Sequence, residues 1–131
     1  MAANEGFDEI LRQAKGLGEL IRTHPRYVRL READAAVRTD KTATQALEAY
    51  NKAAADIARK EAATEPVEVE DKRQLQRLHG AVASNETIKA FTLAQADYAE
   101  LMRRMNDTIF RAIAQGEQGA AHEGGAGAMT G

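Results

Sequence analysis

Apolar residues recur along most of this chain at steps of three and four positions. Such steps place side chains on one face of an α-helix, whereas a strand alternates apolar and polar residues one by one. The longest series steps by 3, 4, 3, 4, 3, 4 and 3 through Ile88, Phe91, Gln95, Tyr98, Met102, Met105, Ile109 and Ala112. A strict series of this kind is typical of the seam of a coiled coil or of a long helical hairpin.

The same spacing predicts four helices before this one. Their apolar series are Phe7 to Ile21, Tyr27 to Val37, Ala43 to Ile57 and, in a short fourth helix, Leu75 to Val82. Pro25 suits the first position of the second helix, Asp40 can cap the third, and Ser84 with Asn85 can cap the last. We therefore expect an all-α fold of about five helices: an antiparallel helical bundle with a long, coiled-coil-like C-terminal helix.

The last stretch of the chain, from Gly116 onward, consists of glycine, alanine and isolated polar residues. A segment of this composition buries too little apolar surface to offset the entropy lost on ordering. We therefore expect the last helix to end at Gln115, with a helical domain over residues 1–115 and a disordered tail over residues 116–131.

The length of the last helix predicts self-association. From Glu86 to Gln115, at ~1.5 Å per residue, it would extend ~45 Å, whereas a globule of this chain length has a diameter near ~36 Å. The overhanging end still carries the apolar seam, and a second copy of the chain is the simplest cover for it. We expect a homodimer or higher oligomer whose interface contains Phe7, Ile10, Ala14, Leu17, Ile21, Phe91, Tyr98, Met102, Met105 and Ile109.

Two small residues of the first predicted helix, Ala14 and Gly18, lie on one face of it. Gly16 and Gly18 occur within the helical spacing and follow no predicted strand, so they do not form a phosphate-binding loop. Each glycine costs a helix up to ~1 kcal/mol relative to alanine. A neighbouring helix that approaches closely over Ala14 and Gly18 would compensate for part of this cost.

Composition and charge narrow the class of protein further. Hydrophobic residues make up 44% of the chain and aromatic residues only 5%, which suits helices that pack through alanine. The net charge of −2 gives no overall attraction to nucleic acid or anionic lipid. Without cysteine the chain has no disulfide and suits a reducing compartment. Because it shows neither a signal peptide nor an apolar run of ~20 residues, we expect a cytoplasmic protein with no membrane contact.

No group of residues suggests catalysis or metal binding. The three histidines, His24, His79 and His122, are scattered, and no two of them have the i, i+4 spacing of a zinc site. The single serine, Ser84, is explained as a helix cap rather than a nucleophile. The carboxylates around Pro66 crowd a solvated turn, without a pocket to separate their pKa values. We expect no catalytic residue, no metal and no cofactor.

The most basic part of the chain is the junction of the first two helices and the second helix itself. Six basic residues face three acidic ones there, a local balance of +3. One interpretation is a docking patch for an acidic protein surface or for RNA phosphates; the other is the solvated face of a short helix. RNA is the less favoured partner, because RNA-binding domains are usually more basic. The candidate docking residues are Arg22, Arg26, Tyr27, Arg29, Arg31 and Arg38.

Order and spacing together give a family resemblance. The motifs are Ala14-Lys15-x-Leu17-Gly18-x-Leu20-Ile21, Pro25-x-Tyr27-x-x-Leu30-x-x-Ala33, Asp40 before a helix bearing Tyr50-Asn51, and Asn85-x-x-Ile88-x-x-Phe91-x-x-Ala94-Gln95-x-x-Tyr98-x-x-Leu101. In this order they resemble the YlbF/YmcA family of small helical bacterial regulators, over about Phe7 to Ile113.

The resemblance implies an oligomeric all-helical protein without enzymatic activity. Better-known relatives are accessory factors in competence, sporulation and biofilm development, and are linked to messenger-RNA processing through ribonuclease Y. Some of them hold an iron–sulfur cluster with cysteines, which this chain lacks. We therefore expect a regulatory or scaffolding protein that acts through protein–protein contacts as a homo-oligomer. The alternative is a weak RNA-binding module that uses the basic region from Arg22 to Lys41.

Overall fold

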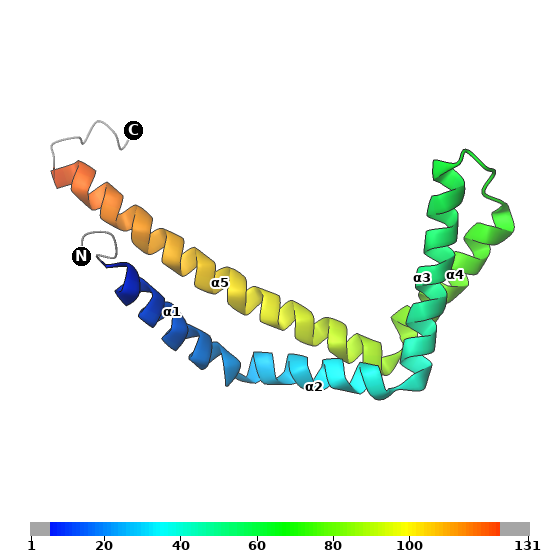
Figure 1. The fold of residues 1–131 in the computed structure, drawn as a ribbon, viewed down its shortest axis with the longest axis horizontal. Helices are drawn as coiled ribbons and strands as arrows, with labels where there is room; N and C mark the ends of the chain where they lie inside the picture. Colours follow the sequence, from blue (N-terminus) through cyan, green and yellow to red (C-terminus); the bar gives the residue numbers. More distant parts are fainter. Residues whose placement is uncertain (1–5, 124–131) are drawn as a thin grey trace. The chain divides into compact units, whose positions relative to one another are not determined.

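The computed structural model of the chain describes residues 6–123, and within that range it contains five α-helices and no strand (Figure 1). The helices are α1 (Phe7–Arg22), α2 (Pro25–Thr39), α3 (Lys41–Ala62), α4 (Val69–Ser84) and α5 (Glu86–Glu123). The prediction of an all-α fold with about five helices and a long last helix is confirmed. The coiled-coil character of that helix stays a prediction.

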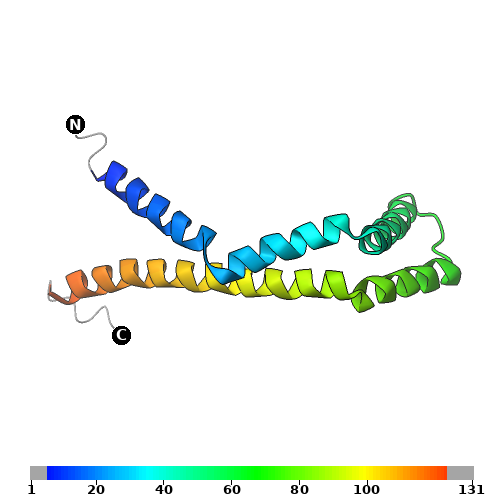
Figure 2. The ribbon, with the colours of Figure 1, turned by 90° about the horizontal axis from the view of Figure 1, so that it is seen from below.

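The chain divides into two units, residues 1–95 and residues 96–131. The first unit holds α1 to α4 and the first turns of α5. Within it α3 and α4 lie side by side as an antiparallel hairpin, and α2 meets α3 at the turn between them (Figures 1 and 2). The second unit holds the rest of α5.

Side-chain caps begin three of the helices. The imidazole Nδ1 of His24 accepts a hydrogen bond from the N–H of Arg26 at 3.1 Å, just before Pro25 opens α2. Asp40 accepts from the N–H of Ala43 at 3.1 Å at the start of α3. These bonds satisfy N–H groups that have no partner within a helix. The predicted cap at Asp40 is thereby confirmed.

Asn85 is the residue that caps α5. Its side chain accepts a hydrogen bond from the N–H of Ile88 at 2.9 Å. Ser84, predicted to share this role, is the last residue of α4, so that prediction was wrong. The reason is geometric: Asn85 has the extended backbone of a cap residue, with φ −73° and ψ 121°, whereas Ser84 still belongs to the preceding helix.

Two helices are longer than predicted. α4 begins at Val69 rather than near Leu75, because its first turns are polar and carry no apolar spacing. α5 continues to Glu123 instead of ending at Gln115. An isolated glycine such as Gly116 costs only ~1 kcal/mol, and the residues that follow are mostly good helix formers. The predicted tail therefore overlaps the end of α5. Its disorder beyond residue 123 lies outside the described residues, and the division at residue 116 stays a prediction.

The turn after α3 is closed by backbone hydrogen bonds and an ion pair. The N–H of Glu65 donates to the carbonyl of Lys60 at 2.8 Å, and that of Thr64 donates to the carbonyl of Glu61 at 3.2 Å. This is the Schellman pattern that ends many helices. Lys60 Nζ also lies 2.7 Å from Asp71 Oδ2. The ion pair joins the end of α3 to the start of α4.

The described chain has very little interior. Within residues 6–116, whose exposure is described, only Ala43, Ile88 and Ala94 are buried apolar residues. Ala43 lies in the first turn of α3, and the other two lie in the first turns of α5, which run beside α2 in both views (Figures 1 and 2). Most apolar side chains of the helices therefore retain some exposure to solvent.

Candidate interaction surfaces

The first candidate surface is the apolar face of α1, on which no residue is buried. The large apolar residues exposed on it are Phe7 (56%), Ile10 (65%), Leu11 (52%) and Leu20 (71%). The charged side chains of α1 lie on the other side of the helix, where Arg12 forms an ion pair with Glu9. This separation is what an amphipathic helix shows when it packs against another surface.

A second apolar face runs along the second half of α5. Tyr98, Met102 and Met105 are half-buried, whereas Ile109 and Ile113 are exposed by 43% and 57%. Phe110, exposed by 66%, lies outside this face, on the same side of the helix as Arg103. On the opposite side of this helix, Arg103 pairs with Glu100 at 3.8 Å and with Asp107 at 3.6 Å. The two faces of α5 therefore differ sharply in polarity.

All ten residues predicted for the oligomer interface retain solvent exposure in the single chain. Ile10, Phe7, Ala14 and Ile109 are exposed, and the other six are half-buried, with Phe91 in the first unit. Leu11, Leu20, Phe110 and Ile113 are exposed apolar residues of the same two helices that do not belong to the predicted 3–4 series. Apolar residues next to that series were the signal that could have identified them.

A hydrogen bond joins the turn between α2 and α3 to the turn between α4 and α5, which lies much later in the sequence. Thr87, in the first turn of α5, donates its hydroxyl to Asp40 Oδ2 at 2.7 Å. The hydrogen bond from Thr87 and that from the N–H of Ala43 hold the pKa of Asp40 below its usual range. We call this junction of the α2–α3 and α4–α5 turns the elbow. Its two partners are 47 positions apart in the chain, so no local spacing predicts the contact.

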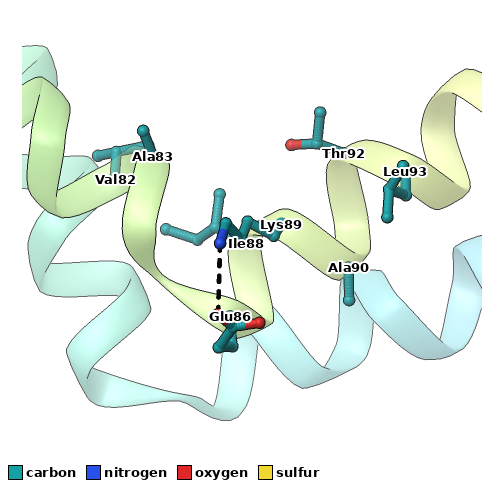
Figure 3. Close-up of a pocket in the computed structure, with 8 residues that line it drawn as sticks. All are labelled: Val82, Ala83, Glu86, Ile88, Lys89, Ala90, Thr92 and Leu93. Carbon is teal, nitrogen blue, oxygen red and sulfur yellow. Dashed lines mark hydrogen bonds and ion pairs between the residues drawn. The ribbon is translucent and has the colours of Figure 1, made fainter.

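An open groove lies on the elbow, where α4 passes into α5 (Figure 3). Its volume is ≈ 690 Å³, and its lining is mostly apolar: Val82, Ala83, Glu86, Ile88, Lys89, Ala90, Thr92 and Leu93. Leu93 is 67% exposed. Lys89 pairs with Glu86 at 3.3 Å, so the groove has one cation and one anion, already matched to each other. The lining offers no unmatched charge to select a ligand.

Arg22 is the last residue of α1, and the four candidate docking arginines of α2 are distributed around that helix rather than gathered on one side. Successive residues of a helix are rotated by about 100°, so Arg26 and Arg31 differ by about 140°. Arg26 is half-buried, whereas Arg29 and Arg31 are exposed. Arg38 forms an ion pair with Asp34, which neutralises part of the basic excess. Tyr27 is half-buried.

The carboxylates near Pro66 do not gather into one site. Asp71 pairs with Lys60, Glu70 with Arg77 at 3.0 Å and Glu65 with Arg59 at 3.9 Å. The hydrogen bond with Lys60 lowers the pKa of Asp71 and raises that of Lys60. Paired in this way, these side chains act as links within and between α3 and α4.

The histidines also lie apart from one another. His24 caps α2, and the ring of His79 lies 5.9 Å from that of Tyr50, centroid to centroid. His122 falls where side chains are not described. Among the described residues, no group of three histidine, cysteine or acidic side chains is arranged to hold a metal ion.

No helix among residues 6–123 combines the length and apolar character that crossing a membrane requires.

Comparison with known proteins gives one family. A family model described as control of competence regulator ComK, YlbF/YmcA, matches residues 10–114, which is more than half of the chain. The matched range runs from α1 to the last turns of α5 whose side chains are described. A search of curated proteins finds no match.

Proposed function

This chain belongs to the YlbF/YmcA family, and from that membership we propose that it is a non-enzymatic regulatory or scaffolding protein. It acts through protein–protein contacts and works as a homo-oligomer. The family description connects these proteins with control of a competence regulator. A role as an accessory factor in developmental regulation or RNA processing is part of the proposal, as is a cytoplasmic location.

The observation that carries the proposal is the exposure of two apolar helix faces. α1 and the second half of α5 each present large apolar side chains, while only three apolar residues of the described chain are buried. Surfaces of this size on a small protein mark contacts with another molecule. Several of the described polar side chains, in contrast, form caps and ion pairs, which stabilise the helices themselves.

Sedimentation of the purified protein at micromolar concentration tests the oligomer. We expect a dimer or a larger species, with a mass that falls on dilution. A monomer of 14.2 kDa at all concentrations would contradict this part of the proposal. Capture from a native lysate, with the partner then identified, tests the regulatory part.

The alternative function is weak RNA binding by the arginines from Arg22 to Arg38. It is supported by the exposure of Arg22, Arg29 and Arg31. Binding of this kind weakens steeply with salt, because phosphate contacts release counterions. Titration of a single-stranded RNA at low salt tests it, with the double variant Arg26→Ala and Arg29→Ala. No binding by the unaltered chain at low salt would exclude this alternative.

A further inference from the structure

The charged residues of α1 and of the second half of α5 follow a common rule. Positions in each helix can be lettered a to g, with the apolar series at a and d, so that Phe7 and Met102 are both a positions. Every charged residue of α1, and every charged residue between Asp97 and Gly116, then falls at b, c or f. The flanking e and g positions are uncharged; on α1 they are Leu11, Gln13, Gly18 and Leu20.

An uncharged flank makes each apolar face wider than a coiled-coil seam. In a two-stranded coiled coil the e and g positions usually carry charges that choose the partner. Here Leu11 and Leu20 on α1, and Leu101 and Ile113 on α5, widen the faces instead. A stripe wider than about 100° is typical of a helix that packs against more than one neighbour. Both helices are thus suited to a bundle.

The apolar series of α1 and of the second half of α5 also match each other in length and in the spacing of their residues. From Phe7 to Ile21 the series of α1 steps by 3, 4, 3 and 4. From Ala112 back to Tyr98 the series of α5 steps by 3, 4, 3 and 4 as well. Two helices with these series form five matching layers when they run in opposite directions. Opposed helices also bring the positive N-terminal end of one dipole beside the negative C-terminal end of the other.

Side-chain sizes alternate in this antiparallel register. Phe7 of α1 falls opposite Ala112, and Ala14 falls opposite Met105, so that a large side chain faces a small one in both layers. Such alternation fills the space between helices without voids. Two parallel registers have the same steps. One starts at Met102, places Ile21 opposite Gly116 and leaves Tyr98 without a layer; the other starts at Gln95, places this polar amide opposite Phe7 and leaves Ala112 without a layer.

We infer that α1 of one copy lies antiparallel along residues 98–112 of α5 in a second copy. By two-fold symmetry each dimer contains two such pairs, and the uncharged flanks let the pairs pack together as four helices. This inference rests on the homo-oligomer of the proposed function and assigns its interface.

The available surface suffices for a stable dimer. Six large apolar side chains are exposed at or beside the apolar series of α1 and of the second half of α5. At roughly 100 Å² each they offer on the order of 600 Å² per copy, or ~1,200 Å² for two copies before the half-buried members of the series are added, and stable interfaces bury ~1,200–2,000 Å². Since neither face carries a charge, two copies meet without burying an unpaired ion.

Cysteine cross-linking between differently tagged chains tests the register, because the natural sequence has no cysteine. A Phe7→Cys chain is mixed with an Ala112→Cys chain, refolded together and oxidised, so that only contacts between copies are detected. We expect at least ten-fold more mixed disulfide than in the control mixture of Phe7→Cys with Arg111→Cys, which moves the second cysteine to the charged side. A second pair, Ile21→Cys with Tyr98→Cys, reports the other end, and sedimentation shows whether each variant remains oligomeric.

The outcomes separate this inference from the proposed function. If the unaltered protein is a dimer but Phe7→Cys cross-links to Met102→Cys or to itself instead, the antiparallel register is wrong and the homo-oligomer stands. If the unaltered protein is a monomer, both the register and the homo-oligomer are overturned.

Discussion

Thr64 has the least favourable backbone conformation among the described residues. It is the only one other than glycine with a positive φ, 54°, and it occupies the left-handed position of the turn after α3. Glycine is preferred there because a side chain, above all a β-branched one, crowds the following carbonyl. The turn therefore forms at a cost that its two backbone hydrogen bonds and the nearby ion pair of Lys60 with Asp71 offset.

Replacing this residue should make the protein more stable. We expect Thr64→Gly to raise the free energy of unfolding by about 1 kcal/mol, through relief of the left-handed strain. Denaturant unfolding at fixed protein concentration measures this. Thr64→Ala is the matched control, because it removes the β-branch but keeps a Cβ, and it should give a smaller gain. Equal destabilisation by both substitutions would contradict the strain.

The two glycines of α1 offer a second comparison between residues. Beyond the adjacent residues and the helix's own backbone, no atom lies within 4 Å of the place where a Cβ would stand on Gly16 or Gly18. Gly16 lies on the charged side of α1, and Gly18 lies beside the apolar series. Only the surroundings in an assembly can therefore distinguish the two positions.

We expect Gly16→Ala to stabilise the protein by up to ~1 kcal/mol, as alanine does in an exposed helix. Gly18→Ala should instead weaken the dimer several-fold, because the added methyl group keeps the neighbouring helix at a distance. Thermal unfolding and sedimentation of both variants measure the two effects. If Gly18→Ala raises stability as much as Gly16→Ala does, no helix approaches closely at that point.

At the scale of elements, the sequence was sufficient for the helices but not for their contacts. The 3–4 spacing predicted α1 and the start of α5 well, because an apolar face is a local, repeated signal. It missed the first turns of α4, where Asp71 accepts a hydrogen bond from the N–H of Glu68 at 3.0 Å and forms an ion pair with Lys60. No local sequence pattern predicts the hydrogen bond from Thr87 to Asp40. Each residue lies at the start of a helix, and that position alone already accounts for its polar side chain.

The elbow should be sensitive to acid. The folded-state pKa of Asp40 is lowered, first by the hydroxyl of Thr87 and then by the N–H of Ala43. A carboxylate with a lowered pKa stabilises the fold above its unfolded value of about 3.9, and that contribution is lost as the pH falls through the lower folded value. We expect the unfolding midpoint to drop below about pH 4 and to vary less with pH in Asp40→Asn.

Thr87→Val isolates the contact between the two turns from the cap. It removes the hydroxyl donor but leaves the bond from Ala43 to Asp40, so it should destabilise less than Asp40→Ala. A double-mutant cycle, read from denaturant unfolding, gives the coupling between the two side chains. Strictly additive effects would mean that the elbow contact contributes no coupling of its own.

At the scale of the whole molecule, the sequence predicted which faces are apolar but could not state what covers them. The covering surface belongs to another molecule, and a single chain carries no record of it apart from spacing and charge. The ten predicted interface residues lie on α1 and α5, and all of them keep some solvent exposure. Their role in assembly stays a prediction.

A charge placed on the α5 face should dissociate the oligomer. We expect Met102→Glu to raise the dissociation constant by at least 100-fold, because an unpaired carboxylate would be buried at the interface. Arg103→Gln, one position along on the charged side, is the matched control and should leave the constant within a few-fold of its original value. Sedimentation across a concentration series measures both, and circular dichroism checks that the variants remain helical. An unchanged mass for Met102→Glu would remove this face from the interface.

The scarcity of buried side chains has a consequence for the lifetime of the protein. Ala43, Ile88 and Ala94 are the only buried apolar residues in the described chain, so a copy that has met no partner gains little free energy from folding alone. Such copies open readily, and opened chains are what proteases degrade. The amount of this protein in the cell should therefore follow the amount of the partner that covers its helices, because copies without a partner are degraded. The ratio of protein to partner is then set by degradation rather than by synthesis.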